Sequence, residues 1–316
     1  MAAPTYELDA ERRRSIKKKN RHNTRVGYAF LTPWLLGFFL LTAGPMLASL
    51  YFSFTDYNLF NSPNWIGLDN YKRLFTDDPD FRKSAEVTLK YVLIGTPIKM
   101  ISALAVAMLL NAARKGMGFY RSAFYLPSLI GGSVSVAIVW KAMFIDNGIV
   151  ARIIEALGGP DAMTGGWVGN PGRTLPMLIL LAVWQFGAPM VIFLAGLKQV
   201  PTELYEAADV DGAGAFRKFW NITIPMLSPV IFFNLLLETI NAFQVFNSAY
   251  IISNGTGGPA RSTLFYTLYL YLRGFRDFQM GYASALAWVL VVVIGVVTLL
   301  LFRSSNAWVH YSGGNK

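Results

Sequence analysis

Long stretches without a single charged residue constrain this chain more than any other feature. Four windows contain no Asp, Glu, Lys or Arg, and they are residues 27–55, 122–140, 174–197 and 278–302. Each reaches or exceeds the roughly 18 apolar residues that a helix needs to cross a bilayer. A soluble domain carries about a quarter charged residues, whereas this chain of 316 residues carries 15%. The sequence therefore predicts an all-α integral membrane protein.

Two further apolar stretches complete the set of predicted spans. One is interrupted only by Lys99 and the other only by Glu238. We therefore expect six transmembrane helices, at about residues 27–54, 91–112, 122–143, 174–197, 224–252 and 278–302. Together they form a transmembrane domain over residues 27–302, with tails at 1–26 and 303–316.

The positive charge of the chain indicates its orientation. Of the 28 Lys and Arg residues, 16 lie in the tails and loops that are cytoplasmic if the N-terminus is inside, and nine lie in the opposite loops. This excess predicts that both termini are cytoplasmic in a multi-pass protein of the cell (cytoplasmic/inner) membrane. The net charge of +10 is thus explained without nucleic acid. No short apolar core with a cleavage site precedes the first span, so we expect that span to remain.

Residues 202–220 predict a helical segment on the cytoplasmic side, between the fourth and fifth spans. Thr202 is the expected N-cap, and Glu203 suits the positive end of the helix dipole. Gly212 and Gly214 are expected to break the helix, and Pro225 suits the first turn of the fifth span.

The two pieces of this segment each have a distinctive face. The first combines small or apolar residues with an acidic ridge, and the second is aromatic; the residues are Leu204, Ala207 and Ala208, then Glu203, Glu206 and Asp209, then Phe216, Phe219 and Trp220. Such faces are expected to dock. Periodicity alone favours docking against the end of the chain's own bundle over docking against another protein.

The order of residues in this segment resembles the EAA motif in the membrane subunits of bacterial ATP-binding-cassette importers. The motif places EAA, three residues, Gly, nine residues and Ile-x-Leu-Pro in series. Here it is matched by Glu206-Ala207-Ala208, Gly212, Ile222 and Pro225, while Ile224 stands where the family usually has Leu. Residues 65–75, 119–144 and 254–288 resemble further segments of the maltose-type carbohydrate uptake permeases.

The resemblance implies a type I importer permease that forms half of a sugar-conducting pore. Its partners would be a second permease subunit in a heterodimer, two ATP-binding-cassette ATPases and an extracytoplasmic sugar-binding protein, within the lipid bilayer. ATP and Mg would be used by the ATPases, so this chain would be neither an enzyme nor the carrier of a cofactor. The implied ATPase-coupling residues are Glu206, Ala207, Ala208, Asp209, Gly212, Ile222 and Pro225.

The fifth predicted span carries a stripe of polar residues. They recur at steps of three or four, on one helix face, and are Asn234, Glu238, Asn241, Gln244 and Ser248. Polar groups inside a membrane usually face a bundle interior or a water-filled path. Amides and carboxylates suit sugar hydroxyls, and Phe243, Phe246 or Tyr250 would stack on sugar rings. The stripe predicts a substrate pathway, with hydrogen bonding between helices as the alternative.

Lys99 and Glu238 are expected at the same depth. Each lies about 13 or 14 residues, or roughly 20 Å, from the predicted inner end of its span. We predict that they pair or that both line the pathway, which makes Lys99 a further pathway candidate; the alternative is that Lys99 extends outward to the membrane surface. The two charges also leave an ion-coupled secondary transporter as a second function.

Enzymatic chemistry has little support in the sequence. No GxxxxGK[ST] phosphate loop occurs, and GAGAFR at 212–217 lacks the third glycine of a dinucleotide fingerprint. His22 and His310 lie in the tails without a ligand cluster, and there is no cysteine. We therefore assign no catalytic, cofactor-binding or metal-binding residue.

Overall fold

The computed structural model describes residues 24, 26–111, 116–159 and 166–310, and these are helical almost throughout. The predicted basic tail, 1–26, falls outside them except for residues 24 and 26. Within the described residues, five helices are long and apolar enough to cross a membrane: Val26–Phe52, Pro79–Asn111, Val134–Ala156, Ala215–Ile252 and Met280–Trp308. A bent pair, Pro171–Trp184 with Gly187–Leu197, adds a sixth. The all-α membrane fold is therefore confirmed.

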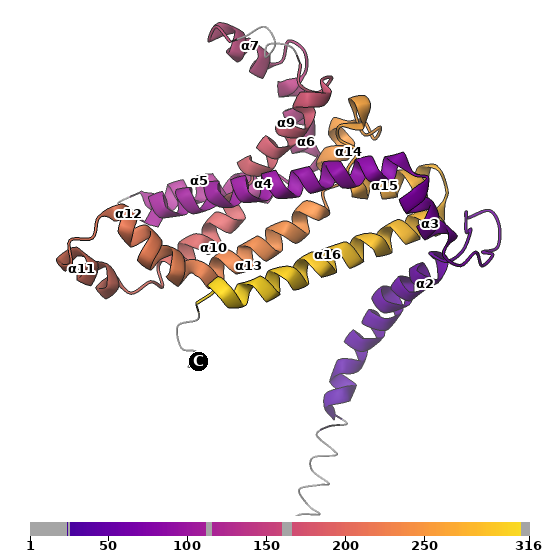
Figure 1. Cartoon of the computed structure of the whole chain (residues 1–316), viewed down its shortest axis with the longest axis horizontal. Coiled ribbons are helices and arrows are strands. Elements are labelled where there is room, and N and C mark those ends of the chain that lie inside the picture. The colour runs from indigo at the N-terminus through magenta and orange to yellow at the C-terminus, as the bar shows by residue number, and fades with distance from the viewer. Residues whose placement is uncertain (1–23, 25, 112–115, 160–165, 311–316) are drawn as a thin grey trace, which may run out of the picture.

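A bundle of long helices forms the body of the molecule (Figure 1). Its members are α4 (Pro79–Asn111), α5 (Met117–Ile130), α10 (Gly187–Leu197), α13 (Ile224–Phe243) and α16 (Met280–Trp308). The helix α4 contacts both α10 and α13, and α13 also contacts α16. With 33 residues, α4 is about 50 Å long, so it runs through the whole thickness of the bundle.

Two apolar clusters form the core along α4. One includes Tyr91 and Val92 of α4 together with residues of the helices at the predicted outer end of the bundle. The other begins at Met100 of α4 and includes Phe193 and Leu227. The turns of α4 between Val92 and Met100 therefore lie between two apolar layers.

The first span departs from this bundle. The second half of this span consists of the π-helix η1 (Phe39–Ala43) and α2 (Gly44–Phe52), and α2 contacts α16. A Cβ on Gly281 would lie only 2.1 Å from the Thr55 carbonyl oxygen, so glycine permits this close approach. From that point the helix diverges from the bundle (Figure 1), and none of its most apolar window is buried.

Residues 65–75 include most of the amphipathic helix α3 (Asp69–Thr76). Leu74 is fully buried, while Phe75 is exposed. The Asn70 side-chain amide donates to the carbonyl oxygens of Ser53 and Thr55, both at 2.9 Å. These contacts fix α3 across the end of the bundle.

Three of the predicted spans are broken rather than continuous. The third, predicted at 122–143, is divided at residues 131–133 into α5 and α6 (Val134–Phe144); the fourth is divided into α9 (Pro171–Trp184) and α10; the fifth is divided into α13 and α14 (Asn247–Ile252). Each of these spans therefore consists of two helical pieces. Gly131 and Gly132 favour the first break, after which Ser133 caps α6 by accepting from the Val136 N–H at 3.3 Å.

The remaining elements are short. They comprise α7 (Ile149–Ala156), the cytoplasmic-side helices α11 (Thr202–Val210) and α12 (Ala215–Lys218), the π-helices η2 (Phe219–Thr223) and η4 (Leu272–Arg276), the 3₁₀ turn η3 (Pro259–Arg261) and α15 (Tyr266–Tyr271).

A buried carboxylate joins three of these elements at the predicted outer end. One oxygen of Asp78 accepts from the N–H groups of Asp80 and Phe81, at 2.9 and 3.0 Å, and so caps α4. The other accepts from the hydroxyls of Tyr269 and Tyr282. Burial alone would raise the pKa of Asp78, but these hydrogen bonds lower it below its usual value. Burial and the bond to Asp78 raise the pKa of Tyr269 to about 12.

Candidate functional site

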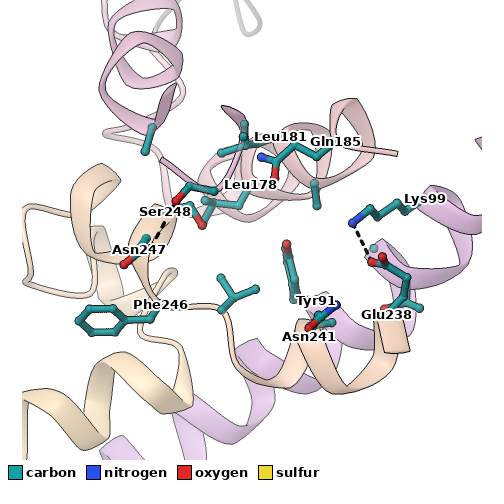
Figure 2. A pocket seen from close by; sticks show the side chains of 18 of the residues that line it. Tyr91, Lys99, Leu178, Leu181, Gln185, Glu238, Asn241, Phe246, Asn247 and Ser248 are labelled. Atoms are coloured by element: carbon teal, nitrogen blue, oxygen red, sulfur yellow. Dashed lines mark hydrogen bonds and ion pairs between the residues drawn. The ribbon is translucent and has the colours of Figure 1, made fainter. Parts of the chain in front are cut away.

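A cavity of about 300 Å³ lies between the two apolar clusters. Its walls come from α4, α9 and α13 and from the three helix breaks, which all meet at this level. Figure 2 shows polar side chains from several of these elements pointing toward one another across it. Irregular backbone inside a membrane is tolerated only where it is buried in protein or lines a cavity. The breaks and the cavity are therefore parts of one feature.

Lys99 of α4 and Glu238 of α13 form an ion pair in the cavity wall. The Lys99 Nζ lies 2.7 Å from Glu238 Oε2, and the side chains are 17% and 12% exposed. The two residues therefore pair and also line the cavity. The alternative, in which Lys99 extends to the membrane surface, is wrong.

The polar stripe of the fifth span is only partly in the cavity. Glu238, Asn241 and Ser248 line it. Asn234 instead lies buried against α10, where its amide donates to the Pro189 carbonyl oxygen at 3.4 Å. Gln244 is exposed at the C-cap of α13 and does not line the cavity. The helix break after Phe243 explains the position of Gln244, since the predicted face assumed an unbroken helix.

The aromatic residues proposed beside the stripe also separate. Phe246 lines the cavity, whereas Phe243 is buried in the core. The Tyr250 ring packs between the rings of Phe246 and Tyr271, with both centroid distances at 5.6 Å. Of the three, only Phe246 is therefore placed to meet a ligand in the cavity.

The opposite wall contains residues that sequence reasoning missed. Tyr91 and Thr96 of α4 and Gln185 at the α9–α10 bend line the cavity. The Thr96 hydroxyl is buried and has no hydrogen-bond partner within the described part of the chain. The Gln185 side chain lies against Gly131, where an added Cβ would come within 2.3 Å of its Cδ. The only signal for this wall was a pair of glycines that faces a polar residue at a helix bend. This arrangement can be recognised only in the tertiary structure.

The cytoplasmic-side segment folds largely as expected, with two helical pieces separated at Gly212 and Gly214. The N-cap differs, because Pro201 occupies that position and no side chain caps the helix. Thr202 is therefore the first helical residue, and its predicted capping role is wrong. Pro225 lies in the first turn of α13, as predicted.

Gly212 ends α11 in a defined way. Its φ of +71° is left-handed, its N–H donates to the Asp209 carbonyl at 3.0 Å, and the Ala213 N–H donates to the Ala208 carbonyl at 2.8 Å. These two bonds form a Schellman motif, in which the left-handed position favours glycine. The motif explains why a glycine occupies this position, with three residues between it and Glu206-Ala207-Ala208.

The helix α11 is not packed into the bundle. None of its nine residues is buried, and Glu206, Ala207 and Asp209 are exposed. The Tyr205 hydroxyl contacts the Thr223 hydroxyl at 3.0 Å, and Lys218 pairs with Asp209. A second cavity, of about 420 Å³, includes Ala208 and Ile222 in its lining. Contact with the end of the chain's own bundle, which periodicity favoured, is therefore limited to the side of α11 that contains Tyr205 and Ala208.

The aromatic face of this segment is also open. Phe216 and Trp220 are 77% and 52% exposed, and the Trp220 ring contacts the rings of both Phe216 and Phe219. Exposed aromatic clusters on one surface mark interaction sites.

Known proteins share sequence similarity with most of this chain. Residues 91–311 match the family model described as "Binding-protein-dependent transport system inner membrane component". The chain is 52% identical over 298 residues to the probable ABC transporter permease protein YesP of Bacillus subtilis (strain 168), with 94% of each chain covered. It is 31% identical to the probable starch degradation products transport system permease protein AmyD of Thermoanaerobacterium thermosulfurigenes, with 86% and 91% covered.

A solved structure has the same fold. It is a bacterial alginate ABC transporter in complex with an alginate pentasaccharide-bound periplasmic protein, and one of its chains aligns with a TM-score of 0.74. The alignment covers 91% of this chain and 96% of that one at 21% sequence identity.

Proposed function

This chain belongs to the family of binding-protein-dependent transport inner membrane components, and from that membership we propose that it forms half of the pore of an ATP-driven importer of mono- or oligosaccharides. It is a permease subunit of the inner membrane and not itself an enzyme. The family favours this function over the ion-coupled secondary transporter that Lys99 and Glu238 had left open.

The polar cavity between the two apolar clusters is the observation that carries the proposal. Amide, hydroxyl and charged groups meet there at the depth of Lys99 and Glu238, together with the Phe246 ring. Sugars present hydroxyls on every side, so a site with several hydrogen-bonding groups and an aromatic ring suits them. A related permease is named for starch degradation products, which supports a carbohydrate substrate.

The coupling partner is proposed to be an ATPase that receives α11. No residue of the helix is buried, and its small residues Ala207 and Ala208 permit close docking beside the carboxylate of Glu206. From Ala215 the chain continues through Ile222 and Pro225 into α13 as one candidate span. A displacement of α11 would therefore be carried along α13 toward Glu238. ATP and Mg would be bound by that partner.

The remaining partners are proposed on the surfaces they would cover. The first span, Val26–Phe52, has no buried residue in its most apolar window, which supports contact with a second permease subunit and with lipid. The predicted outer end, around α3 and α15, would receive a sugar-loaded binding protein, and the alginate transporter of the same fold was solved in complex with a pentasaccharide-bound periplasmic protein.

The test is reconstitution of the chain with its second permease, its ATPase and its binding protein in lipid vesicles. Maltotriose, a starch-derived probe, and a panel of other oligosaccharides are offered with the binding protein outside. We expect ATP hydrolysis stimulated by one class of sugar, and uptake that stops when the ATP site of the ATPase is disabled. Uptake that survives this change and collapses with ionophores would instead show a secondary transporter.

A further inference from the structure

The helices α6 and α14 lie side by side, and each begins directly after a break that lines the cavity. Gly132 and Ser133 precede α6, while Val245 and Phe246 precede α14. The two helices therefore share one wall of the cavity and are each joined to the bundle by a non-helical linker at the same level.

Hydrogen bonds tie the two helices together at both ends. At their beginnings, the Asn247 side-chain amide donates to the Gly132 carbonyl oxygen at 3.4 Å. Toward their ends, the Lys141 Nζ donates to the Ile251 carbonyl oxygen at 3.1 Å and to the Asn254 Oδ1 at 2.6 Å.

Lys141 contacts the part of α14 that determines how the helix ends. Asn254 has a left-handed φ of +52°, its N–H donates to the Ile251 carbonyl at 3.3 Å, and the Gly255 N–H donates to the Tyr250 carbonyl at 2.7 Å. This is a second Schellman motif, here with asparagine at the left-handed position. A cation beside the last carbonyl groups of a helix is also electrostatically favourable.

The connection of the two helices to the rest of the bundle is mainly apolar, since Phe144 of α6 and Ala249 and Ile252 of α14 are buried in the same cluster as Tyr91 of α4. The Trp140 indole donates to the Met177 carbonyl of α9 at 3.3 Å, and its ring contacts the Trp184 ring. The α9 helix in turn packs on α4, where Gly95 lies against Ile179. Apart from the Trp140 indole bond, these contacts are apolar and non-directional, whereas the hydrogen bonds of Lys141 are directional.

We propose that Lys141 is a positioning residue that makes α6 and α14 move as one gate over the cavity. The linkers at residues 131–133 and 244–246 are the hinges, and Lys141 keeps the two moving helices in register. This inference rests on the proposed function, because movement would be driven by the partner ATPase.

The native chain has no cysteine, so pairs of introduced cysteines can be spin-labelled specifically in this subunit, which is then assembled with partner subunits whose own cysteines have been replaced. Val139→Cys with Thr256→Cys reports the distance between α6 and the turn that directly follows α14, and Val139→Cys with Leu93→Cys reports the distance from α6 to α4. All three sites are exposed. Pulsed electron paramagnetic resonance compares the nucleotide-free complex with the complex trapped by ATP and vanadate.

We expect the distance between residues 139 and 256 to stay constant while the distance between residues 139 and 93 shifts. Lys141→Met should broaden the first distribution and slow turnover several-fold at unchanged apparent affinity for the loaded binding protein, and Lys141→Arg should restore both. If Lys141→Met does not assemble, Asn254→Gly removes one acceptor while keeping the left-handed conformation.

Two results would overturn the inference. One is a change between residues 139 and 256 as large as that between 139 and 93, or no change in either. The other is a Lys141→Met complex with an unaltered distance distribution. Either result in a complex that hydrolyses ATP leaves the proposed function standing, whereas a purified complex without ATPase activity would refute the proposed function itself.

Discussion

Lys99 and Glu238 show at the scale of single residues how a charge is kept inside this bundle. Each would be costly alone in hydrocarbon, and each is more than four-fifths buried, with Nζ and Oε2 only 2.7 Å apart. A charge left behind after its partner is removed has no compensation. The pair therefore matters more through the penalty for breaking it than through its net attraction.

Removal of one partner should thus destabilise the subunit. We expect Lys99→Met or Glu238→Leu to cost roughly 3–5 kcal/mol, the range typical for breaking a buried pair, and to lower uptake. The double variant Lys99→Glu with Glu238→Lys should recover much of the loss. Thermal unfolding of the purified complex, followed by tryptophan fluorescence, measures this, and a double variant as unstable as the singles would argue against the pair.

Gly131 and Gly132 are neighbours with different surroundings. An added Cβ at Gly131 would lie 2.3 Å from Gln185 Cδ and 2.6 Å from the Pro127 carbonyl oxygen, whereas one at Gly132 would meet nothing within 4 Å. We expect Gly131→Ala to cost about 1–3 kcal/mol through overpacking and to displace Gln185 from the cavity wall.

The matched control for this prediction is Gly132→Ala, which should leave the melting temperature nearly unchanged. Thermal unfolding of both variants separates the two positions. Equal melting temperatures for the two alanine variants would mean that the contact of Gly131 with Gln185 is readily relaxed.

At the scale of elements, the coupling segment depends on how α11 ends. Gly212 has a φ of +71° and Gly214 a φ of −68°, so only the first needs the left-handed conformation. An alanine there costs about 1 kcal/mol or more. We expect Gly212→Ala, and more strongly Gly212→Val, to reorient α11 and to uncouple ATP hydrolysis from uptake, while the subunit still inserts into the membrane.

Gly214→Ala serves as the control, since a Cβ at Gly214 would meet nothing within 4 Å. Uptake per ATP hydrolysed, measured in vesicles, is the readout. An unchanged ratio for Gly212→Val would remove α11 from the coupling pathway.

At the scale of the whole molecule, Asp78 joins the start of α4 to α15 and α16. Its oxygens accept from two backbone N–H groups and from the hydroxyls of Tyr269 and Tyr282. Arg273 lies above the Tyr269 ring and donates to its hydroxyl at 2.8 Å. The start of α4, α15 and α16 are therefore fixed as one unit at the predicted outer end.

This network should make stability depend on pH in a known direction. Because folding lowers the pKa of Asp78, the folded state favours the carboxylate, and the stabilisation is complete above the unfolded pKa of about 3.9. It is lost as the pH falls below that value and through the folded pKa. Asp78→Asn should lower the melting temperature at pH 7, and the gap to the native complex should narrow on acidification.

The neighbouring Asp77 is exposed, so Asp77→Asn should have little effect at either pH. Melting curves of the three complexes between pH 7 and pH 3.5 test this. A gap between Asp78→Asn and the native complex that stays constant or widens with acidification would contradict the assigned network.

The composition of the spans and the division of the coupling segment at Gly212 follow from the sequence, because they depend on local properties. In lipid, the backbone polar groups of a long charge-free run must be hydrogen-bonded within the protein, and a helix achieves this within the run itself. A helix that ends in the left-handed conformation favours glycine at that position. The equal depth of Lys99 and Glu238 also followed, since helical rise is nearly constant.

The positions at which the spans break, and the residues that the breaks expose, were decided only by the tertiary structure. The same apolar sequence can form a continuous helix or a broken one, because a neighbouring helix and a cavity can satisfy the backbone polar groups at a break. For this reason Gln185, Thr96 and Lys141 were not recognised, and Gln244 was placed on a face that the break removes. The sequence by itself determined what must lie in the membrane, and only the packing of distant helices determined which of those residues meet around the cavity.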